Sequence, residues 1–443
     1  MASSTDEHEW TTHAEAFSRV TEFITNIAGR NTLVADLQAR MLTETGTRLV
    51  DWVDRIGVPK PADFETVGFA ESKLGAESIW QHPGAMLPVV FETTRDTLVI
   101  HVDSVSQFLL ANGFDERTEI IGDPRDTVRR ACVSIEGDCE LHVVERHGTL
   151  AWNSGPTGSR KSINKHTERM LLRRRDFAND EEGFAHAREV FTAAANDVGT
   201  NRACEMFFAG ERAYWQSRNR AARVQKMRQD KLGLGWANQD HHTYRSSRAA
   251  FPNLIETLEL MGFECRERFY AGAEAGWGAQ VLEQTECRVV IFADVDLSPE
   301  EIAGDFAHSE LPPQDNPGTV GLWCALHGEA FLQAGMHHLE CQFDFNASRE
   351  QLAAEGVETM SPFTDFDHLR QAFTVGERWQ VPEARLTKAI ADGFISEEDA
   401  ARFRADGVIG SHLEILERND GYKGFNKTGI SDIILETNPK TAT

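Results

Sequence analysis

The order of expected strands and helices repeats in the second half of the chain, and this repetition limits the possible folds more than any single element. From Trp236, the patterns predict a strand in "WANQDHHTYR", a helix in "AAFPNLIETLELMGF" and three further strands. After the connector "LPPQDNPGTVG" the same order recurs, with a helical insertion before the final strand. We therefore predict an α+β fold of repeated βαβββ modules that form a half-open barrel.

The rest of the chain predicts two further segments. We expect a helical start and one degenerate βαβββ-like module over residues 1–157, then a basic helical connector over 158–235 and the two-module barrel over 236–440. Basic runs in the connector, such as "RMLLRRRDF", could indicate RNA binding. In a chain this acidic, such runs are more often helix faces that pair with acidic neighbours.

Charge and cysteine content narrow the classes of partner and compartment. The net charge of −25 argues against a nucleic-acid partner, because phosphate binding requires a basic surface. No apolar run approaches the roughly 20 residues that span a bilayer, and the first residues lack a signal-peptide pattern. The cysteines form no C-x-x-C motif, which favours a reducing compartment. We therefore expect a cytoplasmic protein with no membrane partner.

Each of the two modules begins with a strand that carries a histidine pair, at residues 241–242 and 337–338, and the final strand carries Glu414. Strand alternation groups His241 and His338 with polar neighbours, so we expect both to face the cavity. Two imidazoles and one carboxylate on three strands form the facial set that suits non-haem Fe(II), because it leaves three positions for substrate and O₂. Vicinal histidines are also common as surface or hydrogen-bonded residues, and the spacing leaves both interpretations open.

The motifs around these residues resemble two Fe(II) dioxygenase families of the vicinal oxygen chelate superfamily. Those of 4-hydroxyphenylpyruvate dioxygenase match Asp240-His241, "AGMHHLEC" and "HLEILERN" followed by "GFNKTGISDI", in the same order and at similar intervals. In the 2-oxoadipate dioxygenase/decarboxylase family an arginine follows the first metal histidine by four residues, as Arg245 follows His241 here. The resemblance covers roughly residues 236–440, and the N-terminal half matches neither family.

The resemblance implies an Fe(II) enzyme that acts on a 2-oxo acid with O₂, by oxidative decarboxylation and hydroxylation. It implies His241, His338 and Glu414 as the metal ligands and Arg245 as the group that holds a distal carboxylate. Phe425 falls where the C-terminal helix of the first family closes the substrate pocket. A dicarboxylate similar to 2-oxoadipate is the favoured substrate, and an aromatic 2-oxo acid is the alternative.

Further candidate residues follow from their positions on the expected strands. Gln280 and Glu340 are candidate catalytic groups, and Gln342 is a candidate substrate-binding group; all three could also orient the ligands. Arg418 follows Glu414 by four residues, so alternation places it on the same face, where it could bind a carboxylate. Gln280 could equally face solvent, and Glu340 could form a salt bridge.

Two other functions remain open from the sequence. Members of the superfamily that use their metal without O₂, such as lyases or isomerases, often have a second glutamate as ligand or base, and Glu340 is the candidate here. A metal-free binding module would use the cavity alone. We expect the N-terminal module to carry no metal and to support the barrel or form a contact in a homodimer.

Overall fold

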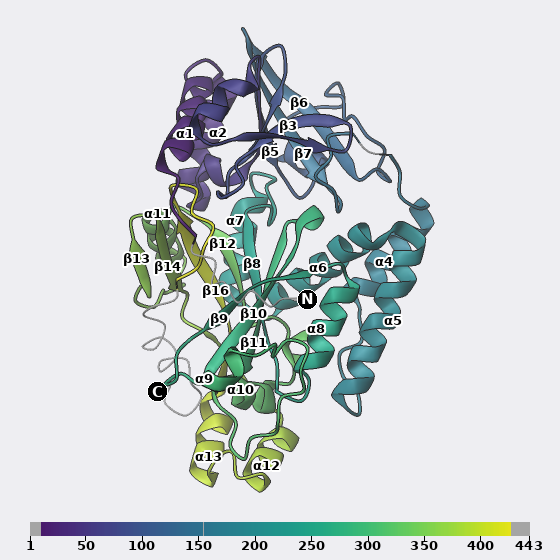
Figure 1. Ribbon diagram of the computed structural model, residues 1–443, viewed down its shortest axis with the longest axis vertical. Helices are drawn as coiled ribbons and strands as arrows, with labels where there is room; N and C mark the ends of the chain where they lie inside the picture. The colour runs from purple at the N-terminus through teal and green to yellow at the C-terminus, as the bar shows by residue number, and fades with distance from the viewer. Residues whose placement is uncertain (1–9, 154, 427–443) are drawn as a thin grey trace.

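Two open β-sheets, one in each half of the chain, organise the molecule (Figure 1). The computed structural model describes residues 10–153 and 155–426; the predicted C-terminal segment 427–440 lies outside this part of the chain. A seven-stranded sheet lies in the first half and a nine-stranded sheet in the second. The predicted α+β fold with repeated βαβββ modules is confirmed.

The nine-stranded sheet contains two βαβββ units that join side by side. The first comprises β8 (Gln239–Arg245), α8 (Phe251–Leu260), β9 (Glu264–Tyr270), β10 (Trp277–Gln284) and β11 (Val289–Asp296). The second comprises β12 (His338–Gln342), α11 (Phe345–Ala354), β13 (Thr364–Phe366), β14 (Leu369–Phe373) and β16 (Val408–Arg418). In each unit the first strand pairs in parallel with the last, and β8 joins β12 in antiparallel orientation.

The seven-stranded sheet repeats this arrangement with shorter elements. Its first unit comprises β1 (Val53–Val58), the 3₁₀ helix η3 (Pro61–Val67), β2 (Ala70–Leu74), β3 (Glu77–Gln81) and β4 (Val89–Glu92). Its second unit comprises β5 (Asp96–His101), α3 (Val105–Ala111), β6 (Val128–Glu136) and β7 (Cys139–Arg146). Again the first strand of each unit pairs in parallel with the last, and β1 joins β5 in antiparallel orientation. The first unit gave no sequence signal of a repeat, because η3 replaces the expected α-helix.

Each sheet has an aspartate that interrupts the pairing at its centre. The β1–β5 register skips Asp54, and the β8–β12 register skips Asp240. An extra residue of this kind re-aims a side chain, and here each carboxylate meets an arginine at the end of the last strand. Asp54 accepts hydrogen bonds from Nε and Nη2 of Arg146 at 2.8 and 2.7 Å, and Asp240 accepts from the same atoms of Arg418, both at 3.0 Å. We call these contacts the two aspartate–arginine pairs.

Four helices connect the halves: α4 (Arg160–Leu171), α5 (Asp180–Val198), α6 (Thr200–Ser217) and α7 (Arg220–Asp230). The basic run before α5 is partly buried against them, since Arg173 Nη2 donates to Glu211 at 3.0 Å and Arg175 forms an ion pair with the same carboxylate. Tyr244 of β8 donates to Glu211 at 3.3 Å. These arginines therefore fasten the connector to the second sheet.

The remaining helices lie around the sheets and at the ends of the molecule (Figure 1). They are α1 (Ala14–Ala28), α2 (Thr32–Arg40), α9 (Pro299–Ile302), α10 (Thr319–His327), α12 (Glu383–Ala391) and α13 (Glu397–Asp406). Shorter elements are η1 (Met41–Thr45), η2 (Leu49–Trp52), η4 (Thr285–Cys287), η5 (Ala330–Ala334) and β15 (Glu377–Trp379). Within 10–153 and 155–426, none of the helices has the length and apolar character required to cross a membrane.

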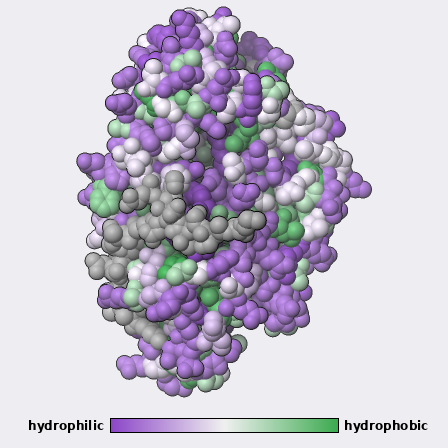
Figure 2. Space-filling model, in the orientation of Figure 1, coloured by the Kyte–Doolittle hydropathy of each residue, from purple (hydrophilic) through white to green (hydrophobic). Residues whose placement is uncertain are grey.

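Local sequence explains where several helices begin. The side chain of Asn179 accepts from the backbone N–H of Glu182 at the start of α5, whose first turn is acidic. Ser396 and Asp399 form a reciprocal capping box at the start of α13. The face in Figure 2 is mostly hydrophilic, which agrees with the net charge of −25, while separate apolar cores pack against the two sheets.

Removing a carboxylate from an aspartate–arginine pair should destabilise the protein strongly. Asp54 is fully buried and faces Arg146, Arg55 and Arg288 at 2.7 to 3.1 Å. Asp54→Ala would leave these cations without their anion, and we expect the free energy of unfolding to fall by about 3–5 kcal/mol. Urea denaturation followed by tryptophan fluorescence measures the change. Asp115→Ala, which breaks an exposed pair with Arg117, is the control and should leave the midpoint unchanged; equal shifts would contradict the assignment.

Candidate metal centre

His241, His338 and Glu414 come together on one face of the nine-stranded sheet. They belong to β8, β12 and β16, which are neighbours in the sheet, and all three side chains are buried. One ligand atom of each lies within 4.8 Å of the ligand atoms of the other two. The strand order produces this meeting, since β12 lies between β8 and β16 and pairs with both.

Each histidine of the cluster faces a glutamate. His241 Nε2 lies 3.0 Å from Glu340 Oε2, and His338 Nε2 lies 3.1 Å from Glu414 Oε2. Burial and the adjacent Glu340 carboxylate raise the pKa of Glu414 well above its usual range. Burial opposes charge on His241, but Glu340 and Asp240 raise the pKa of His241 to about 9. The metal-free cluster therefore holds protons that a cation would displace.

The aspartate–arginine pair of this sheet orients His241. Asp240 Oδ1 lies 3.3 Å from His241 Nδ1, and the pKa of Asp240 is held well below its usual range by the Arg418 guanidinium, although burial opposes ionisation. An ionised carboxylate accepts the Nδ1–H proton, which leaves Nε2 free to bind a metal. This is the usual arrangement around a metal-bound histidine.

A second histidine orients His338. The Nδ1 atoms of His337 and His338 are 2.9 Å apart, and Thr243 Oγ1 lies 2.8 Å from His338 Nε2. His337 packs against Trp323 of α10, as alternation predicts, with ring centroids 5.6 Å apart. It also lines the cavity, because it precedes β12, which begins at His338.

Gln371 of β14 fixes the carboxylate of Glu414. Its Nε2 donates to Glu414 Oε1 at 3.0 Å and lies 3.5 Å from Glu340 Oε2. The sequence gave no signal for Gln371, because its approach depends on the pairing of β14 with β16 across the helical insertion. Gln371 is thus a supporting residue that only the tertiary structure reveals.

Aromatic rings form most of the wall of the cavity beside this cluster. The rings that line it belong to Phe269, Trp277, Phe292, Phe363, Phe373 and Phe425. The ring centroids of Phe292 and Phe425 lie 4.6 and 5.4 Å from that of His241. Aromatic surface beside convergent polar side chains, which here include Arg245 and Asp294, is typical of a small-molecule site. The apolar surroundings strengthen the electrostatic interactions among these polar groups.

The structure divides the other predicted site residues into two groups. Among the residues that line the cavity are Arg245, Glu340 and Phe425, whereas Gln280, Gln342 and Arg418 are not among them. Gln280 Nε2 instead donates to the carbonyl oxygens of Glu267 and Val281 at 3.0 and 3.1 Å. Its amide therefore supports the sheet and does not reach the cluster.

Gln342 and Arg418 both bind Asp240, the residue that precedes His241 on β8. Gln342 Nε2 donates to Asp240 Oδ2 at 3.1 Å, and Arg418 holds both carboxylate oxygens. Arg418 Nη1 also donates to the carbonyl of Gly424 at 2.6 Å, next to Phe425. These contacts with Asp240 give Gln342 and Arg418 a positioning role, and their contact with a substrate stays a prediction.

The first sheet has a counterpart of this arrangement. Arg146 Nη1 donates to the carbonyl of Ala151 at 2.8 Å, and the adjacent Trp152 lies over Arg55, with the guanidinium 4.8 Å from the ring centroid. The strand registers align Arg55 with His241, Thr97 with His338, and His142 with Glu414. A guanidinium has no acceptor for a cation, so this position cannot act as a ligand.

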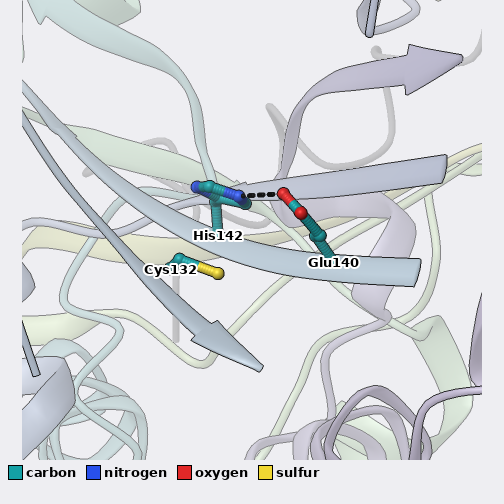
Figure 3. A group of neighbouring side chains, drawn as sticks. All are labelled: Cys132, Glu140 and His142. Atoms are coloured by element: carbon teal, nitrogen blue, oxygen red, sulfur yellow. Dashed lines mark hydrogen bonds and ion pairs between the residues drawn. The ribbon is translucent and has the colours of Figure 1, made fainter. Parts of the chain in front are cut away.

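A separate group of potential ligands lies on β6 and β7 (Figure 3). Cys132 pairs with His142 across the two strands, and Glu140 Oε2 lies 3.0 Å from His142 Nε2. These three side chains are only partly buried, and Glu140 also accepts from Arg95 at 2.9 Å. We therefore place the candidate metal centre at His241, His338 and Glu414.

The donor set of this centre fits a divalent cation with open coordination positions. Two imidazoles and one carboxylate match the facial set of non-haem Fe(II), whereas structural zinc sites are closed and rich in thiolates. Cys341 lies between Glu340 and Gln342 on β12, so alternation directs its thiol to the opposite face. The residues present therefore fit Fe(II).

Comparisons with known proteins give limited similarity. No family model and no curated protein matches the chain. A mutant 4-hydroxymandelate synthase from Streptomyces coelicolor is 13% identical over 88% of this chain and 98% of that chain, with a TM-score of 0.30. A putative glyoxalase superfamily protein from Ralstonia eutropha is 13% identical over 59% of this chain and 97% of that chain, with a TM-score of 0.34. Methylmalonyl-CoA epimerase from Mycobacterium tuberculosis is 13% identical over 41% of this chain and 88% of that chain, with a TM-score of 0.24. At such scores a function has to be argued from the residues of the site.

Metal binding should release protons and become tighter as the pH rises towards 9. A metal needs the neutral imidazole of His241, whose pKa of about 9 keeps it protonated in the metal-free protein. We expect affinity for Fe(II) or Zn(II) to rise about tenfold per pH unit for each proton displaced. Calorimetry in buffers of different ionisation enthalpy counts the protons.

Substitutions in both places distinguish the buried centre from the group of potential ligands on β6 and β7. His241→Ala and Glu414→Ala should each abolish high-affinity metal binding, while Cys132→Ser, which alters the group on β6 and β7, should retain it. Affinity that does not change with pH, or loss of binding in Cys132→Ser, would contradict the assignment.

Proposed function

We propose that this protein is a non-haem Fe(II)-dependent dioxygenase that decarboxylates and hydroxylates a 2-oxo acid. The proposal is carried by the buried group of His241, His338 and Glu414, whose ligand atoms lie within 4.8 Å of one another beside an aromatic cavity. Three protein ligands leave the open positions that a chelating substrate and O₂ require.

A ferrous ion held by His241, His338 and Glu414 would offer open positions for chelation by the 2-oxo acid and would supply electrons to O₂. The side chains of the protein do the remaining work. Asp240 and His337 bind the Nδ1 atoms of the two imidazoles and so keep each Nε2 on the side of the carboxylates. Phe292 and Phe425 cover His241 and would exclude water from the reacting atoms.

The position of Arg245 favours a dicarboxylate, such as 2-oxoadipate, as the substrate. It follows His241 by four residues on β8, about 13 Å further along the strand, and both residues line the cavity. Its Nε and Nη1 atoms are buried and have no hydrogen-bond partner among the described residues. A guanidinium binds a carboxylate through two parallel hydrogen bonds, so Arg245 would hold the distal end of a substrate whose 2-oxo acid group is at the metal.

A lyase or isomerase that uses its metal without O₂ is the second candidate. Asp240, His241 and Glu340 form a group of potential ligands that overlaps the first. Glu340 Oε1 is buried and accepts no hydrogen bond within the described residues, with Arg418 Nη2 at an ion-pair distance of 3.9 Å. A second carboxylate beside the metal could bind the ion or move a proton of the substrate.

Reconstitution with iron distinguishes these functions. After anaerobic loading with Fe(II), we expect 2-oxoadipate to cause O₂ uptake and CO₂ release in equal amounts, measured with an oxygen electrode and a CO₂ assay. His338→Ala should abolish both. Turnover of the acid without O₂ would indicate the lyase or isomerase, and failure to take up metal would leave a binding module and contradict both enzyme proposals.

Arg245→Ala tests the role of the guanidinium. Loss of a bidentate contact with a carboxylate should raise KM for 2-oxoadipate about 100-fold, and KM for 2-oxohexanoate, which lacks the distal carboxylate, far less. Arg245→Lys keeps the charge but not the paired donors, so its effect should be intermediate. Equal effects of Arg245→Ala on the two acids would contradict the contact.

A further inference from the structure

At the outer edge of the first sheet lies the second group of potential metal ligands, which differs from the buried centre because it contains a thiol. Cys132 of β6 and Glu140 and His142 of β7 each offer one ligand atom, and these atoms lie within 4.8 Å of one another (Figure 3). The side chains of Glu140 and His142 are 21% and 16% exposed, and Cys132 is also partly buried. The group is therefore open to ions from solvent while the sheet holds it in place.

Strand pairing brings the three side chains together. Cys132 pairs directly with His142, and the Cβ atoms of directly opposite residues lie about 5 Å apart on one face of a sheet. Glu140 precedes His142 by two residues on β7 and so shares its face. The register is irregular between Cys132 and Ser134, and a bulge at this point bends the strand and re-aims its side chains. The backbone of the sheet therefore sets the positions of the three ligands.

The strand registers place this group next to the counterpart of the buried centre. His142 takes the position that Glu414 has in the second sheet, and Cys132 pairs with His142 as Phe373 pairs with Glu414. Phe373 lines the cavity of the second sheet, so Cys132 and His142 belong to the corresponding face of the first sheet. The first half thus keeps a potential ligand at one matched position and has a thiol beside it.

One nitrogen of His142 has no contact in the metal-free protein. His142 Nε2 lies 3.0 Å from Glu140 Oε2, whereas Nδ1 is buried and has no hydrogen-bond partner among the described residues. Buried polar atoms are normally satisfied. An imidazole that donates its one N–H to a carboxylate has a lone pair on the other nitrogen, and this is the form that binds metals.

The carboxylate and the thiol complete a donor set for a cation. Burial opposes ionisation of Glu140, but hydrogen bonds from His142 and Arg95 hold its pKa below the usual range. Arg95 Nη1 donates to Oε1 of Glu140 at 2.9 Å and leaves Oε2 on the side of His142. Burial and the charge of Glu140 raise the pKa of the Cys132 thiol, so the sulfur keeps its hydrogen until a metal displaces it.

We propose that Cys132, Glu140 and His142 bind one thiophilic divalent cation, Zn(II), which clamps β6 to β7. Thiolate and imidazole ligands select Zn(II) over Mg²⁺ and Ca²⁺, and tetrahedral coordination leaves one position for water. When the cation binds, the thiol releases its hydrogen to solvent and the sulfur bonds to the metal. This site lies beyond the proposed function and replaces the metal-free role that we expected for the first half.

A clamp at this position would secure the last strand of the sheet. Within the described residues β6 pairs with β7 on one side, and its other side carries a single bridge, between Ile121 and Arg130. An outer strand with few partners opens more readily than a central one. A cation that binds only the folded arrangement stabilises it, so Zn(II) would hold β6 on the sheet.

The third group of potential ligands, Glu259, Cys265 and His308, lacks these features. All three residues are exposed. The two ring nitrogens of His308 lie 2.8 Å from Glu259 Oε1 and 3.0 Å from Asp305 Oδ1, so neither is without a partner. We therefore assign no metal to this group, and its cysteine provides a matched control.

Co(II) is the probe that distinguishes the sites. A thiolate bound to Co(II) gives a charge-transfer band in the near ultraviolet, which imidazole and carboxylate ligands do not give. The buried centre contributes no thiolate, because Cys341 points to the opposite face of β12. The full chain is titrated anaerobically with Co(II), and the absorbance of this band is followed.

Wild type and His241→Ala should both develop the band, and Zn(II) should remove it by displacing the Co(II). Cys132→Ser should lack the band, whereas Cys265→Ser should retain it. His142→Ala keeps the thiol and should weaken Co(II) binding at this site about tenfold or more. The proposal is overturned if wild type shows no band, if Cys132→Ser keeps it, or if Cys265→Ser abolishes it.

A gain of affinity provides a second test. Binding here should be weaker than at the buried centre, because solvent reaches the group and Arg95 competes for the Glu140 carboxylate. Arg95→Ala removes this competing cation and should tighten Co(II) binding about two- to fivefold. Arg117→Ala, which breaks an exposed ion pair with Asp115, is the control and should leave the affinity unchanged. Equal affinity in wild type and Arg95→Ala would contradict the part assigned to Glu140.

Hydrogen exchange tests the clamp itself. Zn(II) should slow the exchange of the amides of β6 in wild type and in His241→Ala, but not in Cys132→Ser. Unchanged exchange of wild-type β6 with Zn(II) would overturn the clamp. None of these measurements depends on turnover, so they stand or fall separately from the oxygenase function.

Discussion

The buried contact between Asp240 and Arg418 is the interaction on which the candidate metal centre depends. It joins β8 to β16 across the intervening β12, so the strands that carry His241, His338 and Glu414 are held together from behind. The carboxylate of Asp240 also fixes the tautomer of His241, and Arg418 holds the backbone that carries Phe425. One ion pair thus couples the geometry of the ligands to the closing of the cavity above them.

The first sheet has the same aspartate–arginine pair, but the residue that follows its aspartate is not a potential metal ligand. Asp54 and Arg146 repeat the contact atom for atom, but Arg55 stands where the second sheet has His241, and Trp152 covers it as Phe425 covers the imidazole. The same framework of strands and ion pairs can therefore hold a potential metal ligand in one sheet and a guanidinium in the other. A few side chains at matched positions decide whether a half can hold a cation at this place.

Local periodicity was sufficient to predict the βαβββ order, because the strands alternate clearly. It left the role of the histidine pairs open, and the family motifs were needed to choose His241, His338 and Glu414 as candidate ligands. Periodicity could not predict Gln371, whose contact with Glu414 depends on the pairing of β14 with β16 across the helical insertion. Alternation also placed Arg418 in the cavity. The irregular register at Asp240 turns that carboxylate towards Arg418 instead, and bulges of this kind leave no pattern in a single sequence.

The candidate ligands come from both units of the second sheet, with β8 contributed by one and β12 and β16 by the other. Their meeting depends on the short antiparallel seam between β8 and β12. A slip of one residue at this seam would turn His338 to the opposite face and separate the three donors. Metal binding at the candidate centre would then report on correct assembly, since a chain with its two units mismatched would not bring the three donors together.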